Sequence, residues 1–496
     1  MPAGHPGSPM DGPSDAMSQD ARRLFALPPF PGARPHRAVR AKPGHRADGT
    51  PEALIDAWRA HRLTPGFWQA DNEGAARRHS AIGTLAHRLS HPGDAAAEAA
   101  LRTDVDRRLL RDLAYHDPFT GAPIAPAGLI AILADWRDLV AANRPIAAAF
   151  GFARWKRDTV APLLWGGRPV PFRPARIAAL ERLPQGATIA VWKARVPDDF
   201  LERLESGRWR VMEVEDGFIR SVGLGADCVP PLSIVVDDIG IHYDWHRPSR
   251  LERMLREGQF DAAMLARAAR LREWLVREGV GKYGVGAHAA LPRPAGDRRH
   301  ILVVGQVEDD RSVRYGSTDV RSNLDLLRRV RAGAPDAFII YRPHPDVEAG
   351  HRRGAIPADV ALRHADSIDA DSPISALIAM VDEVHVITSL AGFEALMQRK
   401  RVATHGVPFF AGWGLTQNLA AIPTRRDVDH TLEELIVATL LQYPRYLDPV
   451  TGLPCTAEVL VQQLISGIQR QNGLLVRLRR MQGRLTLLVS QITGAR

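Results

Sequence analysis

Residues 209–217 read Trp-Arg-Val-Met-Glu-Val-Glu-Asp-Gly, and this stretch decides the fold class of the chain. Its apolar half is typical of a buried strand, and two carboxylates followed by glycine are typical of the turn that ends one. Similar apolar runs alternate with amphipathic helical stretches beyond residue 135. This alternation predicts an α/β fold with parallel sheets covered by helices on both faces. The runs are 146–152, 187–192, 209–214, 232–236, 301–304, 337–341, 383–387 and 402–404.

A passage rich in glycine, proline and alanine over residues 281–298 separates the first four runs from the last four. Such a composition is typical of an interdomain linker. We therefore predict two Rossmann-like domains that face one another across a cleft, with ligands at the carboxyl ends of the strands. The predicted parts are a disordered arm over 1–49, a helical segment over 50–135, a first Rossmann-like domain over 136–285, a second over 299–450, and C-terminal helices over 451–496.

The chain of 496 residues carries 65 basic and 56 acidic residues, which gives a formal charge of +9. The basic residues are spread along the whole chain, without a zinc finger or a basic arm, so we expect no nucleic-acid partner. Biased arginine usage, an anionic substrate or an anionic membrane surface explains the charge. With two cysteines, no signal peptide and no run of about 18 apolar residues, the sequence predicts a reducing compartment and no membrane span.

One internal repeat is visible. The pattern Tyr-x-Asp-Pro-x-Thr-Gly-x-Pro begins at Tyr115 and recurs at Tyr446, and each copy leads into a helical stretch. The shift is about the size of the predicted two-domain unit. We therefore interpret the first copy as the end of a lost or truncated preceding module.

The first candidate site is the carboxylate pair Glu215 and Asp216, with Arg220 as a supporting residue. The pair follows a strand and precedes a glycine, which is where an α/β sheet presents an acid to its cleft. A solvated turn is the structural alternative.

The second candidate is the loop after the run over 337–341. His344 lies between two prolines that fix the backbone, so its imidazole is placed to donate to a phosphate oxygen. Pro345 is one of these prolines, and Arg342 adds a permanent cation. A rigid loop with a surface histidine is the alternative.

The third candidate follows the run over 383–387, where Thr388 and Ser389 lead into a helix. The N–H groups and the dipole at a helix start favour anions, and Ser389 adds a hydroxyl. Gly392 is a supporting residue, and Glu394, about one turn further, is placed to reach the hydroxyl pair of a ribose. Ser389 as a plain N-cap is the alternative.

The fourth candidate is Gln306 with the acidic residues Asp309 and Asp310, after the run over 301–304. These acids lack a histidine partner and calcium-loop spacing, so we expect hydrogen bonding and no metal. A carboxylate in the first domain and an anion site in the second is the arrangement expected of a nucleotide-sugar glycosyltransferase. In that reading, the predicted donor-binding residues are Gln306, Arg342, His344, Pro345, Ser389 and Glu394.

Seven longer motifs contain these candidates in order. They occupy residues 215–225, 230–244, 247–252, 305–310, 342–347, 388–396 and 408–416. Together they resemble the capsule polysaccharide synthesis family of KpsC type, and the likeness runs over about residues 115–464. The resemblance implies a GT-B-like retaining β-Kdo transferase that uses CMP-Kdo and needs no metal or other cofactor.

The resemblance also implies roles for individual residues. Asp216 is the catalytic carboxylate, and retention through two inversions makes it the nucleophile, whereas a carboxylate acting only as a base predicts inversion. His344 and Ser389 bind the phosphate of CMP. Trp192-Lys193-Ala194 departs from the family pattern, because a glycine-containing turn is expected there.

The implied partners are the CMP-sugar donor, a glycolipid or Kdo-primed acceptor met from the cytoplasmic side of the membrane, and capsule synthesis or export proteins. A second Kdo transferase is a further implied partner, because such enzymes usually carry two modules and one is complete here. A basic amphipathic stretch over residues 473–496 is typical of a helix on an anionic membrane surface, and internal packing is the alternative. Two other functions stay open: a non-catalytic scaffold of a capsule assembly complex, and a transferase for another CMP-activated ulosonic acid.

Overall fold

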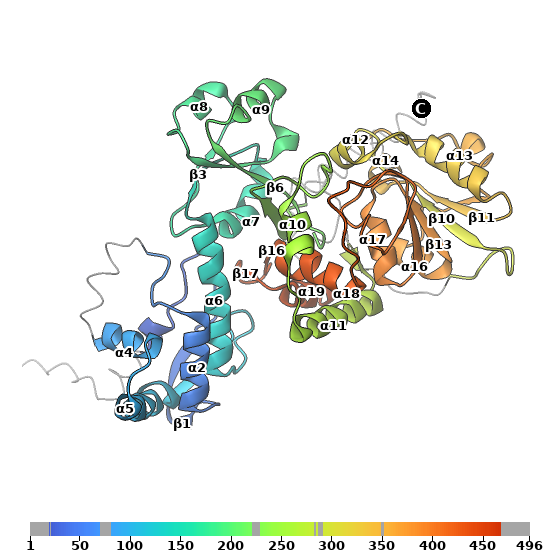
Figure 1. Ribbon diagram of the computed structural model, residues 1–496. Coiled ribbons are helices and arrows are strands. Elements are labelled where there is room, and N and C mark those ends of the chain that lie inside the picture. The colour runs from blue at the N-terminus through green and yellow to red at the C-terminus, as the bar shows by residue number, and fades with distance from the viewer. Residues whose placement is uncertain are drawn as a thin grey trace, which may run out of the picture. The chain divides into compact units, whose positions relative to one another are not determined.

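The computed structural model describes residues 19, 21–69, 81–220, 229–281, 284–285, 291–348 and 352–467. The chain divides into two compact units, and Figure 1 labels many of their elements. Unit 1 consists of Met1–Ile146, Ala161–Pro171 and Val450–Pro454. Unit 2 consists of Ala147–Val160, Phe172–Pro449 and Cys455–Arg496.

Unit 1 combines a two-stranded antiparallel sheet with helices. Strand β1 (Val39–Arg46) pairs with β2 (Arg111–Tyr115). The hydroxyl of Thr50 accepts the N–H of Ala53 and so caps the first helix after β1. The helical elements are α2 (Pro51–His61), α4 (Ala81–Ser90), α5 (Ala95–Val105), the π-helical turn η1 (Asp106–Leu110) and α6 (Pro126–Asn143).

The predicted disordered arm over residues 1–49 is wrong for residues 21–49. The rings of Phe25 and Tyr115 pack edge to face at 5.2 Å, and those of Phe30 and Trp136 at 5.6 Å. Both phenylalanines are buried. The average composition of this segment is dominated by proline, glycine and arginine and therefore predicted disorder. Such an average does not reveal the few apolar side chains that pack against the rest of the unit. Residues 1–18 and 20 lie outside the described residues.

Unit 2 contains two sheets, and the first has seven strands in the order β17-β16-β7-β6-β5-β3-β4. Strands β5 and β6 are parallel, as are β3 and β4, whereas β7 is antiparallel to both β6 and β16. The sheet is therefore mixed and not wholly parallel as the sequence predicted. Its strands are β3 (Ile146–Phe150), β4 (Phe172–Arg173), β5 (Thr188–Val191), β6 (Arg210–Asp216), β7 (Ser233–Asp237), β16 (Pro444–Leu447) and β17 (Pro454–Cys455).

Short helices follow the strands of this first sheet. Residues of β3 and β5 form one apolar core with α8 and α9, and Phe150 and Phe200 are buried in it with ring centroids 5.1 Å apart. The helices are α7 (Arg154–Leu164), α8 (Ile177–Glu181), the 3₁₀ turn η2 (Lys193–Arg195) and α9 (Asp198–Leu204).

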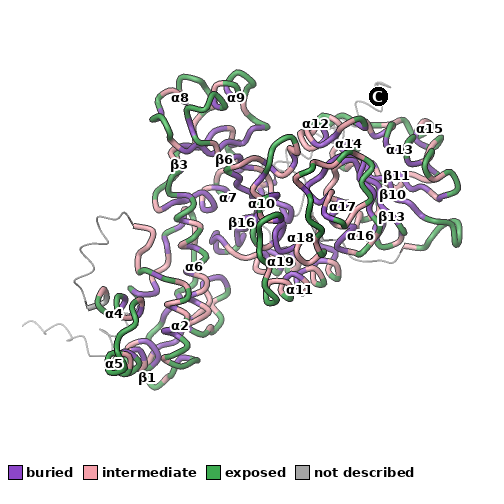
Figure 2. The backbone as a smooth tube through the Cα atoms, viewed as in Figure 1, coloured by how far each residue is buried: buried purple, intermediate pink, exposed green. Residues whose placement is uncertain are grey.

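The second sheet has six parallel strands in the order β12-β11-β10-β13-β14-β15. Strand β10 lies in the middle and is buried along its whole length, because helices cover both faces (Figure 2). The strands are β10 (His300–Val304), β11 (Phe338–Arg342), β12 (Ser367–Ile368), β13 (Glu383–Val386), β14 (Arg401–Thr404) and β15 (Gln417–Asn418). The helices are α12 (Arg311–Gly316), α13 (Asn323–Gly333), α14 (Pro345–Glu348), α15 (Ala358–Ala361), α16 (Ile374–Met380) and α17 (Leu390–Met397).

The chain passes between the two sheets twice. Helices α10 (Arg250–Glu257) and α11 (Ala262–Glu278) and the short strands β8 (Val280–Gly281) and β9 (Gly284–Val285) lead from the first sheet to the second. Helix α18 (Leu432–Ile436) and the π-helical turn η3 (Val437–Gln442) lead back. Strand β16 then pairs with β7, so the predicted second domain over 299–450 includes a strand of the first sheet.

The predicted end of the second domain at residue 450 was wrong, because an apolar run identifies a strand but not the strand with which it pairs. Similarly, β17 and α19 (Ala457–Ile465) follow β16, so residues 451–467 are not helical throughout. The predicted basic helix over 473–496 lies outside the described residues. Among the helices that the structure describes, none is both long and apolar enough to cross a membrane.

The sequence repeat is also a structural repeat. Each copy runs from a π-helical turn through a strand into a glycine turn and then a helix. The hydroxyl of Tyr115 donates to the carbonyl of Leu109, and that of Tyr446 donates to Leu440, each at 2.7 Å. The glycines at position seven of the two copies have φ angles of 72° and 71°, a region that favours glycine. Unit 1 therefore contains a second copy of the segment that closes the first sheet of unit 2.

Candidate functional site

Asp216 ends β6 and lies between two cations. Lys156 Nζ is 3.2 Å from its Oδ1, and Arg220 Nε is 2.8 Å from its Oδ2. The side chains of Lys156 and Arg220 are 7% and 1% exposed, whereas that of Asp216 is 21% exposed. Two adjacent cations stabilise negative charge on a carboxylate, most strongly where water is scarce. Asp216 is thus oriented from two sides and still open to solvent.

Lys156 is held by an aromatic ring as well as by Asp216. It comes from α7, and its Nζ lies 3.3 Å from the ring centroid of Trp192, directly after β5. Burial lowers the pKa of Lys156, and the charges of Asp216 and Glu215 oppose this change. A cation–π contact replaces part of the lost hydration. Trp192, which stands where a glycine-containing turn was expected, therefore supports the cation that faces Asp216.

Glu215 lies beside Asp216 but on the opposite face of β6, because side chains alternate along a strand. Its Oε1 accepts the backbone N–H of Asp216 at 3.0 Å. Burial, reinforced by the charge of Asp216, raises the pKa of Glu215 to about 7, and Asp310 of the second domain acts in the same direction. A carboxyl group with a pKa near neutrality is suited to general base catalysis.

Glu213 lies on the same face of β6 as Glu215 and carries a polar cluster. Lys193 Nζ lies 2.8 Å from its Oε2, and the hydroxyl of Tyr243 donates to its Oε1 at 2.8 Å. Both charged side chains are at most 10% exposed. Tyr243 also interacts with the guanidinium of Arg311, which belongs to the second domain. The two domains of unit 2 therefore meet at this cluster.

In the second domain, the side chain of Gln306 forms hydrogen bonds that hold a neighbouring loop in place. Its Nε2 donates to Thr388 Oγ1 at 3.0 Å, and the N–H of Thr388 donates to its Oε1 at 2.8 Å. The buried amide of Asn323 in turn donates to the Gln306 carbonyl at 2.8 Å. Gln306, predicted to bind the donor, thus holds Thr388 and Ser389 in place.

His344 directly precedes α14, and its ring has a defined orientation. The backbone N–H of Asp346 donates to its Nδ1 at 3.1 Å, so in the neutral ring Nε2 carries the proton and is the donor. Arg342 is turned toward the loop after β12, where its Nη1 donates to the carbonyl of Asp369 at 2.9 Å. Pro345 is exposed and occupies the first position of α14, where proline suits a helix.

Ser389 caps α17, because its Oγ accepts the N–H of Ala391 at 3.3 Å. Gly392 is required for packing, since a Cβ there would lie 2.7 Å from the ring of Phe410. Glu394 lies on the same helix and reaches the linker, with Oε1 2.8 Å from the Cβ that a side chain at Gly281 would have.

The acidic residues after Gln306 have structural partners. Asp309 forms an ion pair with Arg352 at 3.1 Å, and Asp310 caps α12 by accepting the N–H of Ser312 at 2.9 Å. Similarly, Asp237 accepts the N–H groups of Ile239 and Gly240, as expected of a turn.

Most of the predicted site residues lie at the carboxyl ends of strands, one group in each of the two sheets. Gln306, His344 and Ser389 follow β10, β11 and β13, which are neighbours, so they lie at the carboxyl edge of the second sheet. Asp216, Glu215 and Arg220 lie at the end of β6 in the first sheet. Lys156 and Arg311 were missed. Lys156 is 60 positions from Asp216 and lies in a helix without a motif. The only feature of the sequence that could have indicated a functional role for it is that the chain contains few lysines.

Comparison with known proteins gives one consistent family. The model of the capsule polysaccharide biosynthesis protein family matches residues 202–278 and 284–446. The capsule polysaccharide modification protein LipA of Neisseria meningitidis (serogroup A) is 41% identical over 331 residues, which are 65% of this chain and 46% of LipA. The chain thus spans about half the length of LipA. The lipopolysaccharide-processing protein LpsZ of Rhizobium meliloti is 39% identical over 328 residues, 64% of this chain and 73% of LpsZ.

Two solved structures of KpsC from Thermosulfurimonas dismutans share this fold. The structure described as a beta Kdo 2,7 transferase is 34% identical with a TM-score of 0.52, and the one described as a beta Kdo 2,4 transferase is 30% identical with a TM-score of 0.55. Each match covers 64% of this chain and 98% of the KpsC chain. The predicted Rossmann-like, GT-B-like fold is therefore confirmed. With its ordered motifs and relatives at about 40% identity, the chain belongs to the capsule polysaccharide biosynthesis protein family, as a protein of KpsC type.

Proposed function

We propose that the chain is a retaining glycosyltransferase that moves Kdo from CMP-Kdo to a Kdo-primed or lipid-linked acceptor in capsule biosynthesis. The observation that carries this proposal is Asp216, held between Lys156 and Arg220 at the carboxyl end of β6 and open to solvent. The likeness to two KpsC transferases over 98% of their chains supports the reaction class.

In the proposed first step, an Oδ atom of Asp216 attacks the anomeric carbon of the donor sugar. The bond from that carbon to the phosphate oxygen breaks, and CMP leaves with the electron pair. In the second step, an acceptor hydroxyl attacks the same carbon, its proton passes to Glu215, and the ester bond to Asp216 breaks. Two inversions give net retention. Lys156 and Arg220 stabilise the carboxylate before the first step and again as it departs.

The donor phosphate is assigned to the second domain. The Nε2–H of His344 donates to a phosphate oxygen, and the start of α17 with the Ser389 hydroxyl provides further donors. Donors that are already in place stabilise the charge that develops on the departing CMP. Side chains thus supply the charge stabilisation in this proposal, and a metal is not required. We place the reaction on the cytoplasmic side of the membrane.

Incubation of the purified chain with CMP-Kdo and a Kdo-primed acceptor tests the proposal. We expect release of CMP and extension of the acceptor, in the presence of a metal chelator as well as without it. Asp216→Asn should abolish transfer, whereas Asp238→Asn, a change at an exposed turn, should not. A panel of other CMP-activated ulosonic acids tests donor identity. Absence of turnover with every donor and acceptor would favour the scaffold alternative.

A further inference from the structure

Helix α12 of the second domain contacts two segments that belong to different parts of the candidate site. On one side, the hydroxyl of Thr388 donates to the carbonyl of Ser312 at 3.2 Å. On the other side, the guanidinium of Arg311 interacts with the hydroxyl of Tyr243 in the first domain. The helix therefore joins the loop assigned to the donor phosphate to the domain that carries Asp216.

The approach of α12 to these two segments is close at Gly316, the last residue of the helix. A Cβ at this position would lie 2.7 Å from Cγ2 of Thr388 and 3.6 Å from the carbonyl oxygen of Tyr243. The first distance is too short for a side chain, so glycine allows α12 to lie directly against Thr388. Close-packed interiors are hardly compressible. A shift of the donor loop would therefore displace α12 as well.

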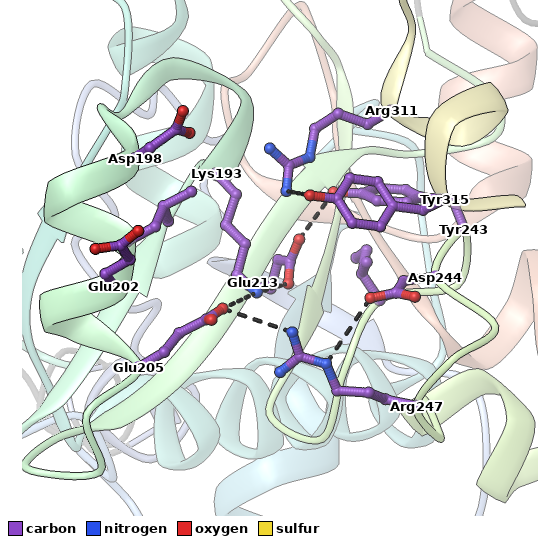
Figure 3. A pocket seen from close by; sticks show the side chains of 12 residues that line it. Lys193, Asp198, Glu202, Glu205, Glu213, Tyr243, Asp244, Arg247, Arg311 and Tyr315 are labelled. Carbon is purple, nitrogen blue, oxygen red and sulfur yellow. Dashed lines mark hydrogen bonds and ion pairs between the residues drawn. The ribbon is translucent and has the colours of Figure 1, made fainter.

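Polar contacts continue from α12 to strand β6. The ring centroid of Tyr315, one turn along α12, lies 4.9 Å from the guanidinium of Arg311, and its hydroxyl accepts from Nη2 at 3.4 Å. The hydroxyl of Tyr243 donates to Oε1 of Glu213 at 2.8 Å, and Lys193 lies 2.8 Å from Oε2 of the same carboxylate. These side chains line a pocket of about 300 Å³ and lie side by side in Figure 3. The contacts thus connect the donor loop with β6.

Tyr243 is the residue through which the two domains are connected in this series of contacts. It is 9% exposed, and burial together with the charge of Glu213 raises the pKa of its hydroxyl well above the usual value. The hydroxyl therefore keeps its proton near neutral pH and donates it to Glu213, while its oxygen accepts from Arg311. Removal of this one hydroxyl would separate the carboxylate of the first domain from the guanidinium of the second.

The donor and the nucleophile of the proposed reaction come from different domains. The donor phosphate is assigned to His344 and Ser389 in the second domain, whereas Asp216 ends β6 in the first. Attack requires the reacting atoms to lie about 3–3.5 Å apart, and a misplacement of about 1 Å costs roughly 10²-fold in rate. The position of one domain relative to the other should therefore determine the rate of the first displacement.

We propose that Arg311 and Tyr243 are positioning residues, which set the distance from the donor loop to Asp216 through α12 and β6. The inference rests on the proposed function, because it concerns the first displacement of that reaction. Both residues act through other groups. They differ in this from Lys156, which contacts Asp216 itself, and from Gln306, which fixes the donor loop within its own domain.

Tyr243→Phe and Arg311→Met test the inference. Each should slow the first release of CMP from CMP-Kdo roughly 10²-fold, measured by rapid quench without acceptor. The affinity for CMP should stay unchanged, because the phosphate contacts lie within the second domain. The double variant should be no slower than the slower single variant, because both changes break one link. Arg311→Lys should restore part of the rate. Arg314→Met, which removes an exposed charge from the same helix, is the matched control.

Hydrogen exchange followed by mass spectrometry gives a readout that does not need turnover. CMP should protect the backbone N–H groups of residues 388–392 and, through α12, those of residues 239–246 in the first domain. Arg311→Met should keep the first protection and lose the second. Arg314→Met should keep both.

The outcomes separate this inference from the proposed function. Unchanged first-turnover rates, losses that add in the double variant, or protection of residues 239–246 that survives Arg311→Met would each overturn the positioning role and leave the proposed function standing. Protection that spreads in the wild type and is confined by Arg311→Met, in a protein that never releases CMP from CMP-Kdo, would support the link and overturn the proposed function. CMP that protects neither segment would overturn both.

Discussion

The ammonium group of Lys156 lies 3.2 Å from Oδ1 of Asp216, although the two residues are 60 positions apart. Only 7% of the Lys156 side chain is exposed. A buried cation beside a nucleophile lowers the energy of the free carboxylate, so it aids the step in which that carboxylate departs more than the step in which it attacks.

Lys156→Met should therefore slow the second displacement most. We expect kcat to fall roughly 10²-fold, as when one preorganised charge-stabilising group is removed. The glycosylated enzyme should accumulate, and intact-protein mass spectrometry measures this as the added mass of one donor sugar. Lys156→Arg should restore part of the rate. A slow Lys156→Met enzyme without any adduct would contradict the assignment of Asp216 as nucleophile.

The rate should depend on the ionisation of Glu215. Because burial and Asp216 raise its pKa to about 7, a base at this position becomes active as the pH rises through 7. We expect kcat to increase from pH 6 to pH 8 with one ionisation, and Glu215→Gln to remove that rise. A rate profile that Glu215→Gln leaves unchanged in shape would assign the base elsewhere.

The same ionisation affects stability with the opposite sign. The folded-state pKa of Glu215 is raised above that of the unfolded chain, so the folded state binds the proton more tightly. Its contribution to the free energy of unfolding should be complete below about pH 4.5 and decline as the pH rises to about 7. Urea unfolding of wild type and Glu215→Gln at several pH values measures this difference.

The two hydrogen bonds between the Gln306 side chain and Thr388 form what we call the Gln306 clamp. Loss of this clamp should weaken donor binding, although Gln306 itself is not assigned to the donor phosphate. Gln306→Leu removes both hydrogen bonds and leaves the backbone N–H of Thr388 without its acceptor, the amide oxygen of Gln306. Each such loss costs about 1–3 kcal/mol, so CMP affinity should fall roughly tenfold or more. Titration calorimetry with CMP measures the change, and Gln417→Ala at the exposed β15 is the control. Unchanged affinity would show that the 388–389 loop does not need the clamp.

Glu252 of α10 ties the loop over residues 419–430 to the first domain. It accepts from Arg425 Nε and Arg426 Nε, each at 3.0 Å, and the side chains of Glu252 and Arg426 are both under 5% exposed. Glu252→Ala leaves a buried guanidinium without its carboxylate, which should lower the free energy of unfolding by about 3–5 kcal/mol. Asp427→Asn breaks the exposed pair with Arg256 between the same two segments and should cost at most about 1 kcal/mol. An equal decrease in the free energy of unfolding in the two variants would show that burial does not make the Glu252 ion pairs more important than the exposed pair.

Much of the site was predictable because its residues follow apolar runs that are visible locally. Asp216, Gln306, His344 and Ser389 were all placed at strand ends, and the structure has them there. Lys156 escaped prediction, since a lysine in a helix becomes functional only through a partner that the fold supplies.

The hydrogen bonds between Gln306 and Thr388 were not predicted, for a related reason. A glutamine at a strand end can face a ligand or a neighbouring loop, and only the position of Thr388 decides between them. The fold of residues 21–49 and the return of β16 to the first sheet were missed likewise, because both depend on pairing between segments that are distant in the sequence.

The return of β16 to the first sheet has a consequence for how the protein is made. Strand β7 is buried at all five positions, and its partner β16 leaves the ribosome about 200 residues later. At ~5–20 residues per second, this apolar strand edge waits about 10–40 s during synthesis for its partner. Unpaired edges of this kind invite aggregation. The yield of folded protein should therefore depend on translation speed and on the supply of chaperones, even though the finished sheet has no such weakness at β7.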